Sequence, residues 1–240
     1  MRAMVLAAGR GERMQPLTQH TPKPLLHVGG KPLLAWHFEA LVREGFNDVV
    51  VNAAYLGQQI IDFCGDGSRW GLRIQLSVEP SPLETGGGIV EALPLLGEDP
   101  FLVVNGDIFI EYPLAQLRES SLAAAGAHLV LVPNPAHNSG GDFALRQSET
   151  SPVGETHRAA RVGRLDCLRQ GDTGWTYSGL GVYQACFFHD CERGKRPLKP
   201  LLDRAIARGV LSGEIWHGTW TDVGTPERLA ALDQTLISRQ

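Results

Sequence analysis

The sequence contains few of the features that mark secreted, membrane-spanning or nucleic-acid-binding proteins. Four scattered cysteines in 240 residues are too few for a disulfide framework and suggest a reducing compartment. No apolar run approaches the roughly 20 residues that a membrane helix needs, and the short apolar opening is not typical of a secretory leader. The formal net charge is -4, so no overall positive field attracts nucleic acid. We therefore expect a soluble, cytoplasmic protein.

Length and patterning favour one large α/β domain. A chain of 240 residues with 43% hydrophobic content can bury a substantial core. Short apolar runs predict strands at 3–7, 48–52, 73–78, 101–104, 128–132, 161–165, 175–183 and 214–220. Helical spacing and stop signals predict helices at 32–45, 56–63, 87–96, 114–125, 198–208 and 225–238. This alternation predicts a doubly wound, mostly parallel sheet.

The pattern weakens between residues 134 and 174, which we interpret as a small insertion or lid on the substrate side, and not as a separate domain. We expect a single domain over residues 1–240. Doubly wound sheets bind ligands beyond the carboxyl ends of their strands. The loops after the first and fourth expected strands are therefore the places to look for chemistry.

A glycine loop follows the first expected strand. Residues 6–14 read Leu-Ala-Ala-Gly-Arg-Gly-Glu-Arg-Met, in which Gly9 and Gly11 would let backbone N–H groups approach a triphosphate. Arg13 adds fixed-charge donors suited to phosphate oxygens. The motif lacks the third glycine of dinucleotide-binding loops and the Gly-Lys-Ser/Thr of the Walker loop. Taken alone, an ordinary glycine turn explains it equally well.

Two further charged residues are well placed for phosphate chemistry. Lys23 lies between Pro22 and Pro24, which stiffen the backbone around its ammonium group. Asp107 follows the apolar run 101–104, where a carboxylate at the end of a central strand is suited to bind Mg²⁺ beside phosphate oxygens. A solvated loop lysine and a simple Asn-Gly turn are the alternative interpretations.

The glycine loop and the Pro-Lys-Pro-Leu motif together resemble the signature of the sugar-phosphate nucleotidyltransferases, also called nucleoside-diphosphate-sugar pyrophosphorylases. The resemblance implies a Rossmann-like nucleotidyltransferase fold with a small sugar-binding insertion. It implies a nucleotide-binding half at 1–133 and a sugar-phosphate-binding half at 134–240. It implies transfer of a nucleoside monophosphate from a nucleoside triphosphate to a sugar 1-phosphate, with release of pyrophosphate. It also implies catalytic roles for Arg13 and Lys23.

Three other segments resemble family motifs: 79–89 the base-recognition segment, 176–181 the strand lining the sugar pocket, and 220–225 the source of a second metal-binding aspartate. The nucleotide-binding residues that the resemblance implies are Gly9, Gly11, Glu12, Arg13, Lys23, Glu79, Thr85, Gly86 and Asn105. The implied sugar-phosphate-binding residues are Asn105, Gly140, Ser178 and Gly179. The implied magnesium ligands are Asp107 and Asp222.

Two departures from the family pattern bear on the substrates. Some relatives carry glutamine where Glu79 stands; a carboxylate only accepts hydrogen bonds, so Glu79 could take the N3–H of uracil but could not serve O4. Many relatives also carry a Glu-Lys-Pro sugar-phosphate motif that is missing here. Lys195 and Lys199 are the candidate replacements.

Within the family, the stretches 19–24, 83–88, 213–214 and 222–225 most resemble one branch. That resemblance implies UTP as the nucleotide and N-acetylmuramate α-1-phosphate as the sugar phosphate, in cell-wall (peptidoglycan) recycling. The alternatives are a mannose-1-phosphate guanylyltransferase and a glucose-1-phosphate uridylyl- or thymidylyltransferase. A non-catalytic nucleotide-sugar sensor is a further alternative. The joint presence of four charged residues speaks against it: Arg13, Lys23, Asp107 and Asp222.

Overall fold

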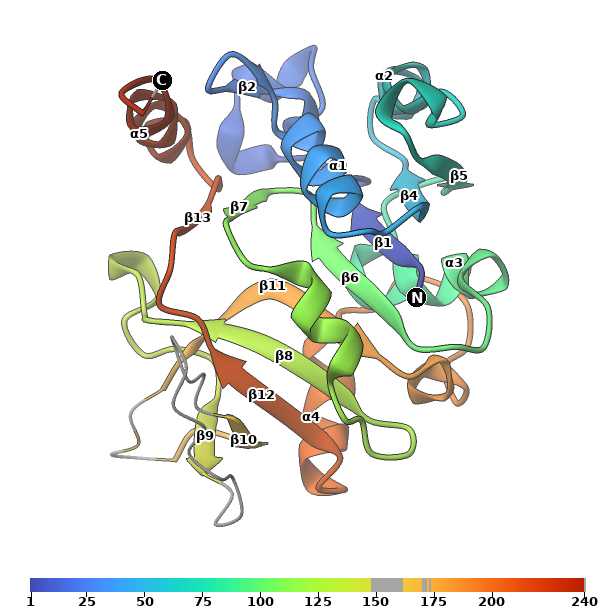
Figure 1. Ribbon diagram of the computed structural model, residues 1–240, viewed down its shortest axis with the longest axis vertical. Coiled ribbons are helices and arrows are strands. Elements are labelled where there is room, and N and C mark those ends of the chain that lie inside the picture. Colours follow the sequence, from blue (N-terminus) through green and yellow to red (C-terminus); the bar gives the residue numbers. More distant parts are fainter. Residues whose placement is uncertain (148–161, 170–171, 173, 240) are drawn as a thin grey trace.

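The computed structural model describes residues 1–147, 162–169, 172 and 174–239. A nine-stranded sheet runs through this part of the chain in the order β5-β4-β1-β6-β11-β8-β12-β10-β9 (Figure 1). Its strands are β1 (Ala3–Leu6), β4 (Asp48–Ala53), β5 (Arg73–Val78), β6 (Phe101–Asn105), β8 (Ala127–Val132), β9 (Ala144–Gln147), β10 (Val162–Asp166), β11 (Thr176–Tyr183) and β12 (Leu211–Ile215).

The other regular elements of the described residues are two small ribbons, five α-helices and several short 3₁₀ turns. The ribbons pair β2 (His27–Val28) with β3 (Lys31–Pro32), and β7 (Ile108–Ile110) with β13 (Trp220–Asp222). The helices are α1 (Leu33–Arg43), α2 (Gly57–Cys64), α3 (Glu84–Leu96), α4 (Lys199–Ala207) and α5 (Pro226–Ile237). None of these helices is long and apolar enough to cross a bilayer.

The sheet is mixed but mostly parallel. Strands β5, β4, β1 and β6 are parallel neighbours, and β8 is parallel to β12. Strands β11 and β10 run antiparallel to both of their neighbours. The doubly wound, mostly parallel arrangement that the sequence predicts is confirmed.

Successive strand residues enter two different cores. Val5 of β1 packs in one core with Phe38 of α1, whereas Met4 packs on the opposite face with Ile89 of α3. The other central parallel strands alternate in the same way. Because helices cover both faces, these strands appear in the sequence as continuous apolar runs.

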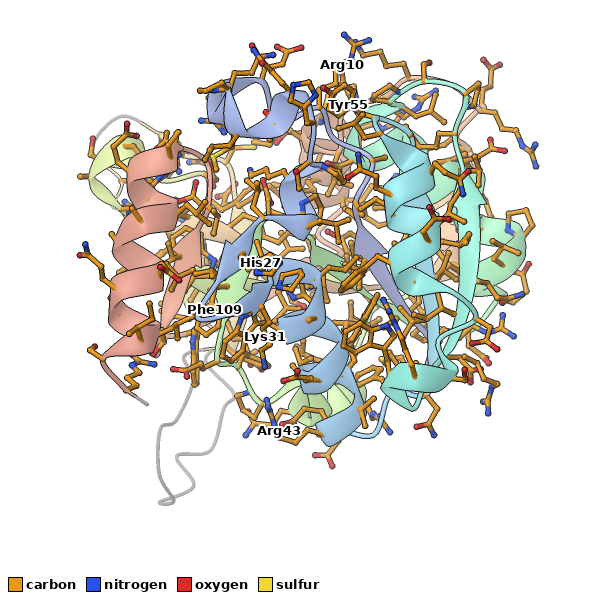
Figure 2. All side chains as sticks on the ribbon, turned by 90° about the horizontal axis from the view of Figure 1, so that it is seen from above. Arg10, His27, Lys31, Arg43, Tyr55 and Phe109 are labelled. Atoms are coloured by element: carbon orange, nitrogen blue, oxygen red, sulfur yellow. The ribbon has the colours of Figure 1, made fainter. Side chains whose placement is uncertain are left out.

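A third core forms where α5 packs against β2 and β13 (Figure 1). Leu232 and Leu236 of α5 join Phe109 there, and the ring of Trp36 packs edge-on against Phe109 with the centroids 5.4 Å apart. The ammonium group of Lys31 lies 3.7 Å from the Trp36 ring centroid. Phe109 and Lys31 are labelled on this side of α1 in Figure 2.

Two expectations about single elements are wrong. In the predicted helix at 114–125, only Leu114–Glu119 is helical, as a 3₁₀ turn. Ser120 and Ser121 follow, and serine side chains favour non-helical backbone by hydrogen bonding locally. The strand expected at 214–220 is two strands in different sheets, because the chain leaves β12 at Ile215 and joins β7 from Trp220 onward.

His37 is buried on α1, behind the segment that carries Asp107. Its side chain is 6% exposed, and Nε2 has no hydrogen-bond partner among the described residues. Burial lowers the pKa of His37 to about 4, against the opposing effects of the Asp107 charge and of the backbone at Gly106 and Ile108. His37 is therefore neutral in the folded protein at neutral pH.

We expect His37 to make the folded state sensitive to acid. Its folded pKa lies below the ordinary value of 6.5, so its contribution to stability is complete above pH 6.5 and is lost as the pH falls towards 4. The shift corresponds to a loss of about 3 kcal/mol. Urea unfolding from pH 7 to 4 should show a smaller loss of stability for His37→Leu than for the wild type. Equal losses in the two proteins would contradict the assignment.

Candidate active site

A cavity of about 900 Å³ opens at the carboxyl ends of β1, β4 and β6. Its position is the one at which doubly wound sheets bind ligands, and its volume suits a nucleotide. The lining comprises residues 6–14 and Lys23, Pro24, Asn52, Glu79, Ser81, Pro82, Leu83, Glu84, Thr85, Asn105, Gly106, Asp107, Lys195 and Gly224.

The glycine loop at residues 6–14, which we call the phosphate loop from here on, forms one wall of this cavity. Gly11 has a left-handed backbone with φ of 62°, and a Cβ atom there would lie 2.9 Å from Cγ2 of Thr18. The Thr18 hydroxyl donates a hydrogen bond to the Gly11 carbonyl at 2.9 Å, which helps to fix the backbone of the loop at Gly11. Arg13 and Arg10, the latter labelled in Figure 2, are exposed residues of the same wall.

Lys23 and Asp107 are in direct contact. The Nζ atom of Lys23 donates to Oδ2 of Asp107 at 2.6 Å; the lysine side chain is 9% exposed and the aspartate side chain 40%. The N–H of Gly106 donates to the Leu6 carbonyl at 2.9 Å, which brings the end of β6 against the end of β1. The structure therefore brings together the predicted catalytic lysine and one predicted metal ligand.

Asp222 lies on the chain segment next to Asp107 but is held by other side chains. The N–H of Val223 donates to the Asp107 carbonyl at 2.8 Å, so the two backbones are adjacent. The Asp222 carboxylate binds Nη1 of Arg228 at 2.7 and 2.8 Å and lies 3.1 Å from Nε2 of His137. It does not line the cavity. Within the described residues, no group of three or more His, Cys, Asp or Glu side chains could hold a metal ion.

Glu79 lines the cavity, but protein donors engage both of its carboxylate oxygens. Asn52 Nδ2 donates to Oε1 at 2.6 Å, and the N–H of Leu83 donates to Oε2 at 2.9 Å. Burial raises the pKa of Glu79, while these two hydrogen bonds favour its ionised form. Asn52 was not identified from the sequence, although a polar residue near the end of an otherwise apolar strand was an available signal.

A segment from the second half of the chain packs against the start of α3. The N–H of Arg196 donates to the Leu83 carbonyl at 2.9 Å, and the N–H of Gly87 donates to the Arg196 carbonyl at 3.0 Å. A Cβ atom on Gly86 would face this segment, and Gly86 does not line the cavity, whereas the neighbouring Thr85 does.

The two candidate lysines for the sugar phosphate lie in different surroundings. Lys195 lines the cavity, with its Nζ atom 3.4 Å from a carboxylate oxygen of Glu84. Lys199, on α4, is paired with Asp203 and does not line the cavity. Only Lys195 of this pair can therefore meet a ligand in the cavity.

The residues expected to bind the sugar phosphate do not all reach the cavity. Asn105 lines it, and its Oδ1 atom is buried with no partner among the described residues. Gly179 lies directly against the Asn105 side chain. Ser178 is buried and donates to the Val130 carbonyl at 2.7 Å, while Gly140 is exposed in a turn. Gly140, Ser178 and Gly179 are outside the cavity lining.

Comparison with known proteins supports the predicted family. Residues 2–141 match the nucleotidyl transferase family. The chain is 47% identical over 234 residues to N-acetylmuramate alpha-1-phosphate uridylyltransferase of Neisseria meningitidis serogroup B, and the match covers 95% of each chain. It is 36% identical over 236 residues to mannose-1-phosphate guanyltransferase of Hypocrea jecorina; that match covers 95% of this chain and 62% of the longer relative.

A solved structure supports the fold. A Bacillus anthracis protein provisionally assigned as a glucose-1-phosphate thymidylyltransferase, solved in complex with a sucrose, superposes with a TM-score of 0.80 at 18% sequence identity. The superposition covers 99% of this chain and 95% of that one. At this identity the likeness concerns the fold. The sequence matches establish that the chain belongs to the nucleotidyl transferase family, as its motifs predicted.

Proposed function

We propose that this protein transfers a uridylyl group from UTP to N-acetylmuramate α-1-phosphate, which yields the UDP-sugar and pyrophosphate. The observation that carries this proposal is the 47% identity to a uridylyltransferase of that specificity, over 95% of both chains. The guanyltransferase relative is less similar, and this chain spans only 62% of its length. The reaction suits a cytoplasmic enzyme of cell-wall sugar recycling.

The reaction requires two anions to meet in line. An oxygen of the sugar 1-phosphate attacks the α-phosphorus, the new O–P bond forms, and the bond to the β-phosphate oxygen breaks as pyrophosphate leaves. Arg13 stabilises the departing pyrophosphate, and Lys23 stabilises the charge that builds on the α-phosphate. The attacking oxygen is already ionised at neutral pH, so no general base is needed. The contact between Lys23 and Asp107 supports this role, because it holds the ammonium group at the cavity wall.

The donor chemistry of Asp107 and Asp222 fits a magnesium ion. Both are carboxylates on adjacent chain segments, and Mg²⁺ is commonly bound by one or two carboxylates together with substrate phosphates. Lys23 is paired with one oxygen of Asp107, whereas Arg228 is paired with both oxygens of Asp222, so an ion at Asp222 would have to displace Arg228. When bound, the ion supplies Lewis-acid polarisation of the reacting phosphate.

The remaining assignments divide the two substrates between the two halves of the chain. Residues 1–133 would hold the nucleotide and residues 134–240 most of the sugar phosphate. The proposed nucleotide contacts are Gly9, Gly11, Glu12, Arg13, Lys23, Thr85, Gly86 and Asn105. Glu79 lines the same cavity, but both of its carboxylate oxygens accept from protein donors, so we do not include it among the direct contacts. The proposed sugar-phosphate contacts are Asn105, Gly140, Ser178, Gly179 and Lys195. The unpartnered Oδ1 atom of Asn105 supports its assignment to both sets, because a buried acceptor requires a donor.

Pyrophosphate release tests the function directly. The protein would be assayed with UTP, GTP and dTTP against N-acetylmuramate, mannose and glucose 1-phosphates. The proposal expects the highest kcat/KM for UTP with N-acetylmuramate 1-phosphate. A higher value for GTP with mannose 1-phosphate would favour a guanylyltransferase. Nucleotide binding without turnover for any pair would favour the sensor.

We expect Asp107→Asn to reduce kcat on the order of 100-fold or more while the protein stays folded. The substitution removes the negative charge that would bind the metal and orient Lys23, and electrostatic contacts of this kind carry effects of that size. Steady-state kinetics and thermal unfolding would measure the two effects. Asp99→Asn, the same change at an exposed position, serves as the control. A kcat near that of the wild type for Asp107→Asn would refute the assignment.

We expect the two candidate lysines to behave differently. Lys195→Ala should raise the KM for the sugar 1-phosphate roughly tenfold, because a charge-assisted contact contributes about 1.5 kcal/mol. Lys199→Ala, outside the cavity, should leave this KM unchanged. Initial rates at saturating UTP would give both values. Similar effects of the two substitutions, or an effect of Lys195→Ala on the KM for UTP alone, would argue against the proposed contact.

A further inference from the structure

A chain of buried hydrogen bonds connects the phosphate loop to the base segment. Asn52 stands on β4 in register with Leu6 of β1. The N–H of Ala7 donates to Asn52 Oδ1 at 2.7 Å, and Asn52 Nδ2 donates to Glu79 Oε1 at 2.6 Å. The N–H of Leu83 donates to Glu79 Oε2 at 2.9 Å. We call this chain of three hydrogen bonds the Asn52–Glu79 bridge.

The two backbone ends determine the polarity of the bridge. A backbone N–H can only donate, so Oδ1 of Asn52 must face Ala7 and Nδ2 must face Glu79. The group of Leu83 that faces Glu79, directly before α3, is likewise a backbone N–H, which can only donate. Glu79 therefore faces a donor at each of its two oxygens. A carboxylate can accept both hydrogen bonds, whereas a glutamine amide would turn its own NH₂ group towards one of the donors.

The surroundings leave the bridge little freedom to rearrange. Asn52 and Glu79 are only 3% and 4% exposed. A Cβ atom on Gly88 would lie 2.8 Å from both Asn52 Nδ2 and Glu79 Oε1, so helix α3 packs tightly over the contact. A buried polar group without a partner is costly, and the arrangement described is the one that satisfies every group.

We propose that Asn52 and Glu79 are positioning residues that set the separation between the phosphate loop and the base segment, and thereby fit the cavity to its nucleotide. Ala7 stands at the start of the phosphate loop, and Leu83 directly precedes Glu84 and Thr85, which line the other end of the cavity. The proposal rests on the proposed binding of a nucleoside triphosphate in this cavity. It does not depend on which sugar phosphate is the acceptor.

Single substitutions should break the bridge in two opposite ways. Glu79→Gln places an amide between two donors, and Asn52→Asp places a carboxylate against a carboxylate. We expect each to raise the Kd for UTP on the order of tenfold, the effect of one unsatisfied buried group. The KM for the sugar phosphate should stay near the wild-type value. Isothermal titration calorimetry with UTP, together with steady-state kinetics, measures the two effects separately.

The double variant Asn52→Asp/Glu79→Gln provides the decisive test. The new carboxylate can accept from Ala7 and from the new amide, whose oxygen can accept from Leu83. All three hydrogen bonds are restored, and only the one between the two side chains changes direction. The net charge of the protein is unchanged. We expect the Kd for UTP to return to within about threefold of the wild-type value, because substitutions at contacting residues are not additive.

Additive losses of affinity in the double variant would overturn the proposal and would indicate that one of the two residues contacts the base directly. Parallel rises of the KM for both substrates with a lowered melting temperature would also overturn it, since they indicate general support of the fold. Asn47→Asp and Glu119→Gln make the same chemical changes at exposed positions and should bind UTP as the wild type does. Calorimetry uses no sugar phosphate, so a failure to turn over N-acetylmuramate 1-phosphate would count against the proposed function alone.

Discussion

The pairing of β1 between β4 and β6 is the constraint on which the rest of the site depends. Leu6 is in register with Asn52 on one side and with Asn105 on the other. Three chain segments therefore leave the sheet at one level and meet at a single edge. A slip of one residue would turn every side chain of a strand to the opposite face. The strand register that sends alternate side chains into the two cores thus also aligns Asn52 and Asn105 with Leu6 at the cavity.

Local charges, rather than the charge of the whole chain, prepare the cavity for anions. The chain is negative overall, yet the cavity wall presents arginine and lysine side chains, among them the buried Lys23. A buried ammonium group without a partner would be costly, and Asp107 removes most of that cost. Arg228 gives Asp222 a partner in the same way. In these two pairs the opposite charges balance, and each partner holds the other in a defined position.

The features that could be predicted from the sequence are those that depend on residues close to one another along the chain. Apolar runs predict the strands, and the glycine loop with Lys23 predicts the family and the phosphate wall of the cavity. Contacts between distant segments could not be predicted in this way. Asn52 meets Ala7 and Glu79 across 45 and 27 positions, and Lys23 meets Asp107 across 84. The predicted helix at 114–125 failed because local helix propensity does not register competition from serine side chains or tertiary packing.

The packing of the Arg196 segment against the start of α3 has a consequence for how this enzyme can evolve. The Arg196 backbone both donates to Leu83 and accepts from Gly87, so the wall that would face the base is supported by the opposite half of the chain. A substitution near Arg196 that moves its backbone would also move that wall, even though it touches no nucleotide. Selection for a different base would therefore act on both halves together, and exchanging one half between homologues would disturb recognition at the join.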